Sequence, residues 1–143
     1  MEENIIEEKS CGAVLYQVKD NIPNYLIVES RSGHISFSKG HVEGKETEWE
    51  TACREICEET GIKEMSRIDG FRERFLCITE KGSQKEIVYF LAEFREKEIR
   101  LQDGELVNYW LLPAEKALQK INTEEEREIL RKADKLLREK NYE

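Results

Sequence analysis

The chain has 143 residues, of which 38% are charged, and its formal net charge at pH 7 is −8. This length is typical of one domain, so we expect a single domain over residues 1–143 with one buried core. The negative balance disfavours long nucleic acid or an anionic membrane surface as a partner, because both are themselves negative. An anionic substrate would need local cations.

The first eight residues, MEENIIEE, are acidic and lead into no long apolar run. A secretory signal has a basic start followed by an apolar stretch, and a membrane helix needs about 20 apolar residues. We therefore predict a cytoplasmic protein that does not span a membrane.

Four cysteines, Cys11, Cys53, Cys57 and Cys77, have neither CxxC spacing nor the density of a disulfide scaffold. We expect them to be small buried hydrophobic residues. Cys53 and Cys57 lie four residues apart on a predicted helix and would make half of a zinc site, but no nearby histidine completes it.

The first part of the chain predicts strands at 10–18 and 25–29, joined as a hairpin by the turn-forming segment KDNIPN. The loop SRSGH follows, from which His34 could reach a substrate, but a loop histidine is more often merely exposed and we do not count it among the site residues. A short strand is predicted at 35–37.

Beyond the first predicted helix, two further strands at 71–79 and 86–94 flank EKGSQK, whose Lys-Gly-Ser centre suits a hairpin loop. A last strand at 106–112 ends at Pro113, and a short helical turn is predicted at 113–120. Strands with few helices predict an α+β sandwich, in which helices pack on a mixed sheet.

A longer helix is predicted at 124–140, and Thr123 followed by Glu126 is a capping-box pattern that marks its start. Apolar residues recur with the helical period along one stripe, so this helix is expected to pack on the core. These residues are Ile129, Leu130, Ala133, Leu136 and Leu137.

A helix over 48–60 is predicted between a second capping box, Thr47 with Glu50, and Gly61, which can adopt the left-handed conformation that ends helices. One apolar stripe is expected to face the core. It consists of Trp49, Ala52, Cys53 and Ile56.

Glu55, Glu58 and Glu59 lie together on a different side of this helix. An acidic solvated face is one interpretation. However, like charges four residues apart destabilise a helix, and carboxylates in the last turn oppose the helix dipole. A divalent cation would reverse both effects, because Mg²⁺ binds carboxylate oxygens together with phosphates. The arrangement therefore predicts a metal site.

The spacing from Gly40 through Glu46 to Arg54-Glu55-Ile56-Cys57-Glu58-Glu59-Thr60-Gly61-Ile62 resembles the Nudix box, GX5EX7REUXEEXGU, at every fixed position. The strands before this segment, and the strands and helix after it, resemble the Nudix α/β/α sandwich over nearly the whole chain. The resemblance implies a mixed β-sheet with helices on both faces.

The same resemblance implies an enzyme that cleaves a nucleoside diphosphate linked to another group, by water attack on phosphorus with Mg²⁺ or Mn²⁺. By position in the box, Glu58 and Glu59 resemble the principal metal ligands, and Gly40 would add its carbonyl oxygen. Glu55 resembles either a further metal ligand or the base that orients the attacking water. Such roles suit carboxylates.

Three further residues receive expected roles from the box and its surroundings. Arg54 is expected to pair with Glu50 or Glu58, and Glu46 to support the loop or the helix entry. Many Nudix enzymes recruit a later acidic residue, for which Glu105 is the candidate. The alternative for Glu105 is a solvated loop glutamate.

The segment FSKGHVEGKE resembles asymmetric bis(5′-nucleosyl)-tetraphosphatases, the diadenosine tetraphosphate (Ap4A) hydrolases, and the downstream segments extend this likeness. In that family the Lys and His of KGH and a later Lys lie near the polyphosphate. The resemblance thus assigns substrate binding to Lys39, His41 and Lys85, whose positive charge would offset a nucleoside polyphosphate.

Some positions depart from the tetraphosphatase pattern. Ser38 stands in place of a proline, and two family tyrosines that contact the nucleotide are replaced near Cys77 and Asn108. Tyr109, or else Phe75, is the candidate replacement, with strand surface or core as the alternative for each. Weaker stacking would alter adenine recognition.

Two alternatives to Ap4A hydrolysis remain open at this point. One is a Nudix hydrolase acting on (d)NTPs or RNA 5′ ends. The other is a non-catalytic nucleotide-binding Nudix module, which the complete set of box carboxylates disfavours.

Overall fold

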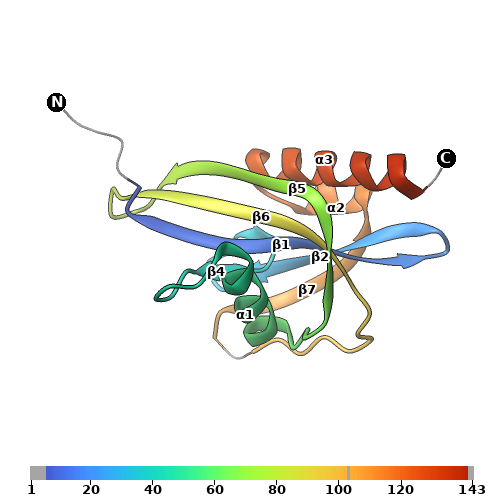
Figure 1. Cartoon of the computed structure of the whole chain (residues 1–143), viewed down its shortest axis with the longest axis horizontal. Helices are drawn as coiled ribbons and strands as arrows, with labels where there is room; N and C mark the ends of the chain where they lie inside the picture. The colour runs from blue at the N-terminus through green and yellow to red at the C-terminus, as the bar shows by residue number, and fades with distance from the viewer. Residues whose placement is uncertain (1–5, 103, 142–143) are drawn as a thin grey trace.

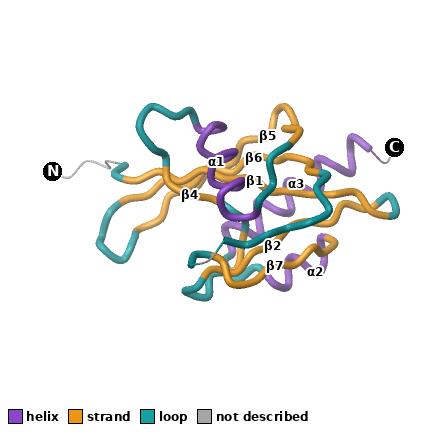
Figure 2. Tube along the Cα trace, turned by 90° about the horizontal axis from the view of Figure 1, so that it is seen from below, coloured by secondary structure: helices purple, strands orange, loops and turns teal. Residues whose placement is uncertain are grey.

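The computed structural model describes residues 6–102 and 104–141. Residues 1–5, which belong to the predicted domain and to its acidic start, lie outside the described residues. A seven-stranded mixed sheet lies between α1 on one face and α2 with α3 on the other (Figure 1, Figure 2). The predicted α/β/α sandwich is confirmed. The elements are β1 (Glu8–Lys19), β2 (Ile22–Ser30), β3 (Ile35–Ser36), β4 (Lys39–His41), α1 (Glu48–Thr60), β5 (Met65–Ile78), β6 (Gln84–Phe94), β7 (Leu106–Pro113), α2 (Ala114–Lys120) and α3 (Glu124–Asn141).

Strand β1 organises the sheet, because it pairs with three other strands. It runs parallel to β6 and antiparallel to both β2 and β4. The main strand order is β3-β2-β1-β6-β5, with β7 added to β2. The segment around Gly40 is thereby placed beside β1, with Cys11 opposite Gly40 and Gly12 opposite Lys39.

The two predicted hairpins are confirmed, although their strands are longer than the apolar runs. The turn between β1 and β2 has positive φ angles at Asp20 (55°) and Asn21 (65°), residues that tolerate this conformation. Strand β5 begins at Met65, six residues before its predicted start at 71, and its pairing with β6 is irregular between Arg67 and Arg72. Short β4 was not predicted, since three polar or small residues carry no strand pattern of their own.

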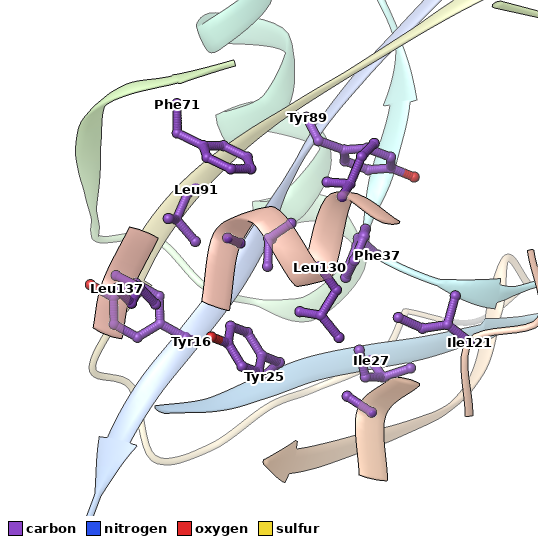
Figure 3. Close-up of a cluster of buried hydrophobic side chains, with 14 of the residues drawn as sticks. Tyr16, Tyr25, Ile27, Phe37, Phe71, Tyr89, Leu91, Ile121, Leu130 and Leu137 are labelled. Atoms are coloured by element: carbon purple, nitrogen blue, oxygen red, sulfur yellow. The ribbon is translucent and has the colours of Figure 1, made fainter. Parts of the chain in front are cut away.

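The core is divided by the sheet into two layers. Figure 3 shows the layer under α3, where Leu130 and Leu137 lie among sheet residues such as Ile27 and Leu91. The other layer lies under α1 and contains Ala52 and Ile56. The predicted apolar stripes of both helices therefore face the sheet, with Trp49 and Cys53 of α1 only partly buried.

The expectation that all the cysteines are buried was wrong for three of them. Cys11 is fully buried, whereas Cys53, Cys57 and Cys77 are half-buried, and all four are free thiols. Within the described part of the chain, no helix is long and apolar enough to cross a membrane.

Helix α1 has the predicted boundaries because its ends are capped. The Thr47 hydroxyl accepts a hydrogen bond from the Glu50 N–H at 3.1 Å, and the Glu50 carboxylate accepts one from the Thr47 N–H at 2.9 Å. Gly61 ends the helix at φ 82°, and its N–H donates to the Cys57 carbonyl. The box glutamates consequently lie on a helix whose first and last residues are fixed by its caps.

We predict that Leu130→Ala, at a position with no exposed surface, lowers the free energy of unfolding by about 2–5 kcal/mol, because it leaves a cavity under α3. Urea denaturation measures this loss. Leu76→Ala, at a leucine that is 43% exposed, is the matched control and should cost less than half as much. Equal losses would contradict the assignment of Leu130 to the core.

Candidate active site

Acidic side chains from α1 and from the loop before β7 share one small cavity. Its volume is about 90 Å³, and its lining consists of Glu55, Glu58, Glu59, Gln102, Glu105 and Leu106. The loop is fastened to the end of α1 by backbone hydrogen bonds, from the Gln102 N–H to the Glu59 carbonyl (3.1 Å) and from the Arg100 N–H to the Thr60 carbonyl (2.9 Å). Glu105 is thus brought beside the three box glutamates, as predicted for a later acidic residue.

Gly40 lies directly against the carboxylate of Glu55. A Cβ atom at Gly40 would stand 1.9 Å from Cδ of Glu55, and 2.2 and 2.4 Å from its two oxygens. The absence of a side chain at Gly40 lets the Glu55 carboxylate lie directly against strand β4. The backbone of Gly40 is therefore close to the cluster of box carboxylates, as the resemblance implied.

Arg54 links the loop to the helix through several oxygens. Its Nε and Nη2 donate to the two carboxylate oxygens of Glu46 at 2.5 and 3.0 Å, and Nη2 also donates to the His41 carbonyl at 2.8 Å. Its Nη1 donates to Glu55 at 3.0 Å and to Glu58 at 3.3 Å. The predicted pair with Glu58 is present, but Glu46 is the principal partner because it binds Arg54 through both of its carboxylate oxygens. Glu50, the other predicted partner, is hydrogen-bonded at the helix cap instead.

Glu46 supports the entry to the helix, as predicted. Besides binding Arg54, its carboxylate accepts hydrogen bonds from the Glu43 N–H (3.0 Å) and the Thr51 hydroxyl (2.8 Å). The Arg54 guanidinium first of all, and then the Glu43 N–H, lower the pKa of Glu46 to about 2 despite some desolvation. The loop from β4 to α1 is therefore held by an ionised carboxylate.

Glu59 is half-buried and lies among other charged side chains. Its pKa is raised to about 7, chiefly by burial and also by the charges of Glu55 and Glu105, while the Ser38 hydroxyl and Lys39 act in the opposite direction. The Ser38 hydroxyl donates to Glu59 Oε1 at 2.6 Å. Such crowding of like charges is relieved by a proton or by a cation.

The donor set fits a hard divalent cation such as Mg²⁺ or Mn²⁺. Carboxylate oxygens of Glu55, Glu58 and Glu59 face a common cavity next to the Gly40 backbone, and oxygen is the ligand that Mg²⁺ prefers. Over residues 6–102 and 104–141, no three acidic, His or Cys side chains converge in a ready-made coordination geometry. Glu55 and Glu58 turn instead toward Arg54, and Glu59 toward Ser38.

One of the two predicted lysines lies beside these carboxylates. Lys39 lines a second cavity of about 60 Å³ with Glu59, Glu105 and His34. Lys85, on β6, is half-buried, and burial lowers its pKa, with the positive charge of Lys39 adding to the effect. The structure therefore brings Lys39 to the acidic cluster, whereas Lys85 lies within reach of the charge of Lys39.

Neither His41 nor Tyr109 lines the two cavities that hold the box carboxylates. The His41 side chain is 61% exposed, and its Nε2 lies 3.3 Å from a carboxylate oxygen of Glu8. Tyr109 of β7 lies opposite Val28 of β2 and is 37% exposed. Their predicted contacts with substrate stay predictions.

The expectation for His34 was wrong. The side chain is half-buried, its Nε2 lies 2.9 Å from Oε1 of the buried Glu126, and the residue lines the cavity of Lys39 and Glu59. The sequence carried one signal for this pair, a glutamate within the otherwise apolar stripe of α3.

The replaced tyrosine positions have local explanations. Phe75 and Cys77 of β5 pack against the core layer under α3. Asn108 is exposed, and its side-chain oxygen accepts a hydrogen bond from the Tyr109 N–H at 2.9 Å. Phe75 therefore belongs to the core, which was the alternative to a nucleotide contact, whereas Tyr109 is partly exposed.

Comparison with known proteins gives consistent matches. A family model described as NUDIX domain matches residues 8–133. Bis(5′-nucleosyl)-tetraphosphatase [asymmetrical] of Mus musculus is 32% identical over 115 residues, which are 72% of this chain and 78% of the relative. The protein of the same name from Caenorhabditis elegans is 29% identical over 127 residues, or 87% and 92% of the two chains. The crystal structure of a C. elegans Ap4A hydrolase binary complex superposes with a TM-score of 0.85 and 26% identity, and covers 92% of this chain and 98% of that chain.

We predict that Glu59 makes metal-free protein less stable as pH rises from about 4.5 to about 7. Across this window the folded state keeps a proton that the unfolded chain has lost, because the folded pKa is raised. Glu59→Gln should therefore match the wild type at pH 5 and exceed its free energy of unfolding at pH 8 by about 1–3 kcal/mol.

Urea denaturation in EDTA at the two pH values measures this difference. Glu58→Gln is the matched control for loss of a neighbouring box carboxylate, because the Glu58 side chain is 53% exposed. A Glu59→Gln variant that tracks the wild type at both pH values would show that Glu59 titrates normally.

Proposed function

Since the chain belongs to the Nudix hydrolase family, whose domain model matches residues 8–133, we propose that it hydrolyses dinucleoside polyphosphates such as Ap4A to ATP and AMP. The reaction is water attack on phosphorus in the presence of Mg²⁺ or Mn²⁺. The observation that carries this proposal is the meeting of four glutamates with Lys39 at one end of α1.

Two lines of support favour a tetraphosphate substrate over other Nudix substrates. Relatives that are named asymmetrical bis(5′-nucleosyl)-tetraphosphatases resemble this chain over 72% of its length or more. Lys39 and Lys85 also supply concentrated positive charge in a protein whose net charge is −8. Long nucleic acid suits such a protein poorly, because its many phosphates would be repelled.

Glu55, Glu58 and Glu59, with the backbone of Gly40, would hold the metal ion. When bound, Mg²⁺ polarises the phosphoryl oxygens and acidifies the attacking water. The metal would also compete with Arg54 and Ser38 for these carboxylates, which are hydrogen-bonded to them in this structure.

The remaining residues are proposed to neutralise phosphate charge and to accept the proton of the attacking water. Lys39 and Lys85 would neutralise phosphate oxygens that the metal leaves uncovered. Glu55 and Glu105 are the two carboxylates proposed to accept the proton of the attacking water, since both line the cavity and neither is needed for the helix cap. His41 and Tyr109 would contact the substrate farther from the cleaved bond.

A cytoplasmic location is part of this proposal. All four cysteines of the chain are free thiols, as is usual in a reducing compartment.

A hydrolysis panel tests the substrate. With Mg²⁺ we expect kcat/KM to be highest for Ap4A among Ap4A, dNTPs, nucleotide sugars and 5′-triphosphorylated RNA, and product analysis should show ATP and AMP. Removal of Mg²⁺ by EDTA should abolish the activity. Glu58→Gln and Glu59→Gln should each lower kcat/KM by about 10²-fold or more, because each removes a proposed metal ligand.

Higher kcat/KM for dNTPs or RNA ends would replace the tetraphosphatase assignment with the corresponding alternative. Binding of nucleotide without turnover of any substrate would favour a non-catalytic module. Glu125→Gln is the control for loss of a glutamate, since Glu125 is exposed on α3 and should leave kcat/KM unchanged.

We also predict that Gly40→Ala lowers kcat/KM and leaves the free energy of unfolding almost unchanged. The new methyl group would displace the carboxylate of Glu55, which is the end of a flexible side chain, so the free energy of unfolding should change by less than about 1 kcal/mol. Misplacement of Glu55 should lower kcat/KM about tenfold or more.

Gly12→Ala provides the contrast on the neighbouring strand. There a Cβ would lie 2.0 Å from the Ser38 carbonyl oxygen and 2.8 Å from the Lys39 Cα, and this backbone cannot yield without breaking the β1–β4 pairing. We expect a clear loss of stability in Gly12→Ala. Wild-type kcat/KM in Gly40→Ala would show that the position of Glu55 is unimportant.

A further inference from the structure

Glu105 comes directly before β7 and lies between two attachments of its loop to the rest of the protein. On one side, the Gln102 N–H donates to the Glu59 carbonyl of α1 at 3.1 Å. On the other side, the Arg31 N–H donates to the Glu105 carbonyl at 2.9 Å, and Nε of the Arg31 side chain donates to the Gly104 carbonyl at 2.5 Å. Arg31, in the loop after β2, therefore binds two successive carbonyl groups at the position of Glu105.

The regular pairing of β2 with β7 ends just beside this turn. The register shifts between Glu29 and Ser30, and Ser30 lies opposite Leu106, the first residue of β7. Gly104 has a φ of 111°, a conformation that favours glycine and turns the chain. Carbonyl groups that lie beyond the end of a strand pair need other donors, and for this turn Arg31 supplies two of them.

The charge of Glu105 opposes its own position. Its carboxylate lines the same cavity as the three box glutamates of α1, and like charges repel one another. This repulsion favours movement of the loop away from the helix. Arg31 counteracts it mechanically, because its Nε binds a backbone oxygen and so restrains the loop itself.

The loop that carries Arg31 is itself held in place. The Gly33 N–H donates to the Ser30 carbonyl and the Ser30 N–H donates to the His34 carbonyl, both at 2.9 Å. Asn122, between α2 and α3, donates from its side-chain nitrogen to the Gly33 carbonyl at 2.9 Å. A donor on this loop therefore has a defined position relative to the sheet and to the helices.

We propose that Arg31 is a positioning residue: its hydrogen bond to the Gly104 carbonyl holds Glu105 in the acidic cavity at the end of α1. The inference rests on the proposed function, in which Glu105 is one of the two carboxylates that accept the proton of the attacking water. Arg31 acts through the backbone of the loop and does not touch the substrate. The contrary role, in which the guanidinium attracts phosphate by its charge, gives a different response to the same variants.

A matched pair of uncharged variants separates the hydrogen bond from the charge. Arg31→Gln keeps an N–H donor at the same number of bonds from the backbone as Nε, whereas Arg31→Met has a similar length and no donor. Arg31→Met should lower kcat for Ap4A about fivefold with KM unchanged, and Arg31→Gln should stay within about twofold of the wild type. Equal losses in the two variants, or a rise in KM, would show that the charge is what matters and would overturn the proposal.

Further variants test whether Arg31 acts through Glu105. Glu105→Gln should lower kcat more than Arg31→Met does, and combining the two should cause no further loss, because the carboxylate to be positioned is already absent. Losses that multiply would show an independent role for Arg31 and would contradict the proposal. Arg100→Gln is the control for an arginine of the loop that carries Glu105: its side chain is 80% exposed and pairs with exposed Glu98, so kcat should not change.

Amide hydrogen exchange gives a readout that needs no substrate. The N–H of residue 31 donates to the Glu105 carbonyl, so its protection factor should fall about fivefold in Arg31→Met and stay unchanged in Arg31→Gln. The Arg100 and Gln102 N–H groups, which bind α1, should keep their protection in both variants. Loss of protection at all three amides would indicate general loosening, and unchanged protection of residue 31 in Arg31→Met would show that the side chain does not hold the turn. Either result would overturn the proposal.

Failure of the positioning role and failure of the proposed function give different results. If the wild type does not hydrolyse Ap4A but exchange at residue 31 responds as expected, the proposed function fails and Arg31 still holds the loop. If Ap4A is hydrolysed and exchange responds but kcat does not, Glu105 needs no positioning and the proposal is wrong. If Ap4A is hydrolysed and neither quantity responds, the positioning role fails alone.

Discussion

The site depends above all on the Arg54 guanidinium, which donates hydrogen bonds to oxygen atoms of four residues. It binds Glu46 through two nitrogens, reaches Glu55 and Glu58, and donates to the His41 carbonyl. Without this cation the acidic side of α1 would repel itself and the loop after β4 would lack its anchor. An arginine suits the position because its planar group presents several donors in fixed directions.

A second organising feature is the central strand β1. It pairs with β4 on one side and with β6 on the other, so that the charge of Lys39 acts on Lys85 although the two lysines are 46 positions apart. Strand β2, also beside β1, carries β3 and β7, and the loops next to these strands bring in His34 and Glu105. The sheet thus determines which cations and which later carboxylates accompany the helix.

The predictions from sequence succeeded where the cause is local. The boundaries of α1, its caps and the shared side of Glu55, Glu58 and Glu59 follow from spacing along one helix, and all are present in the structure. They failed where distant parts of the chain meet. Strand β4 exists only because β1 is beside it, and Glu126 is buried only because His34 and Tyr89 supply donors.

By itself, therefore, the sequence determined the family and the sandwich of helices on a mixed sheet, through the motif that resembles the Nudix box. It also determined which carboxylates share one side of α1, because helical periodicity and capping act over a few residues. Only the tertiary structure decided that Arg54 pairs chiefly with Glu46, that Glu105 and Lys39 adjoin the box, and that His34 is held by Glu126. These arrangements depend on strand order and on burial, which place together residues that no local pattern connects.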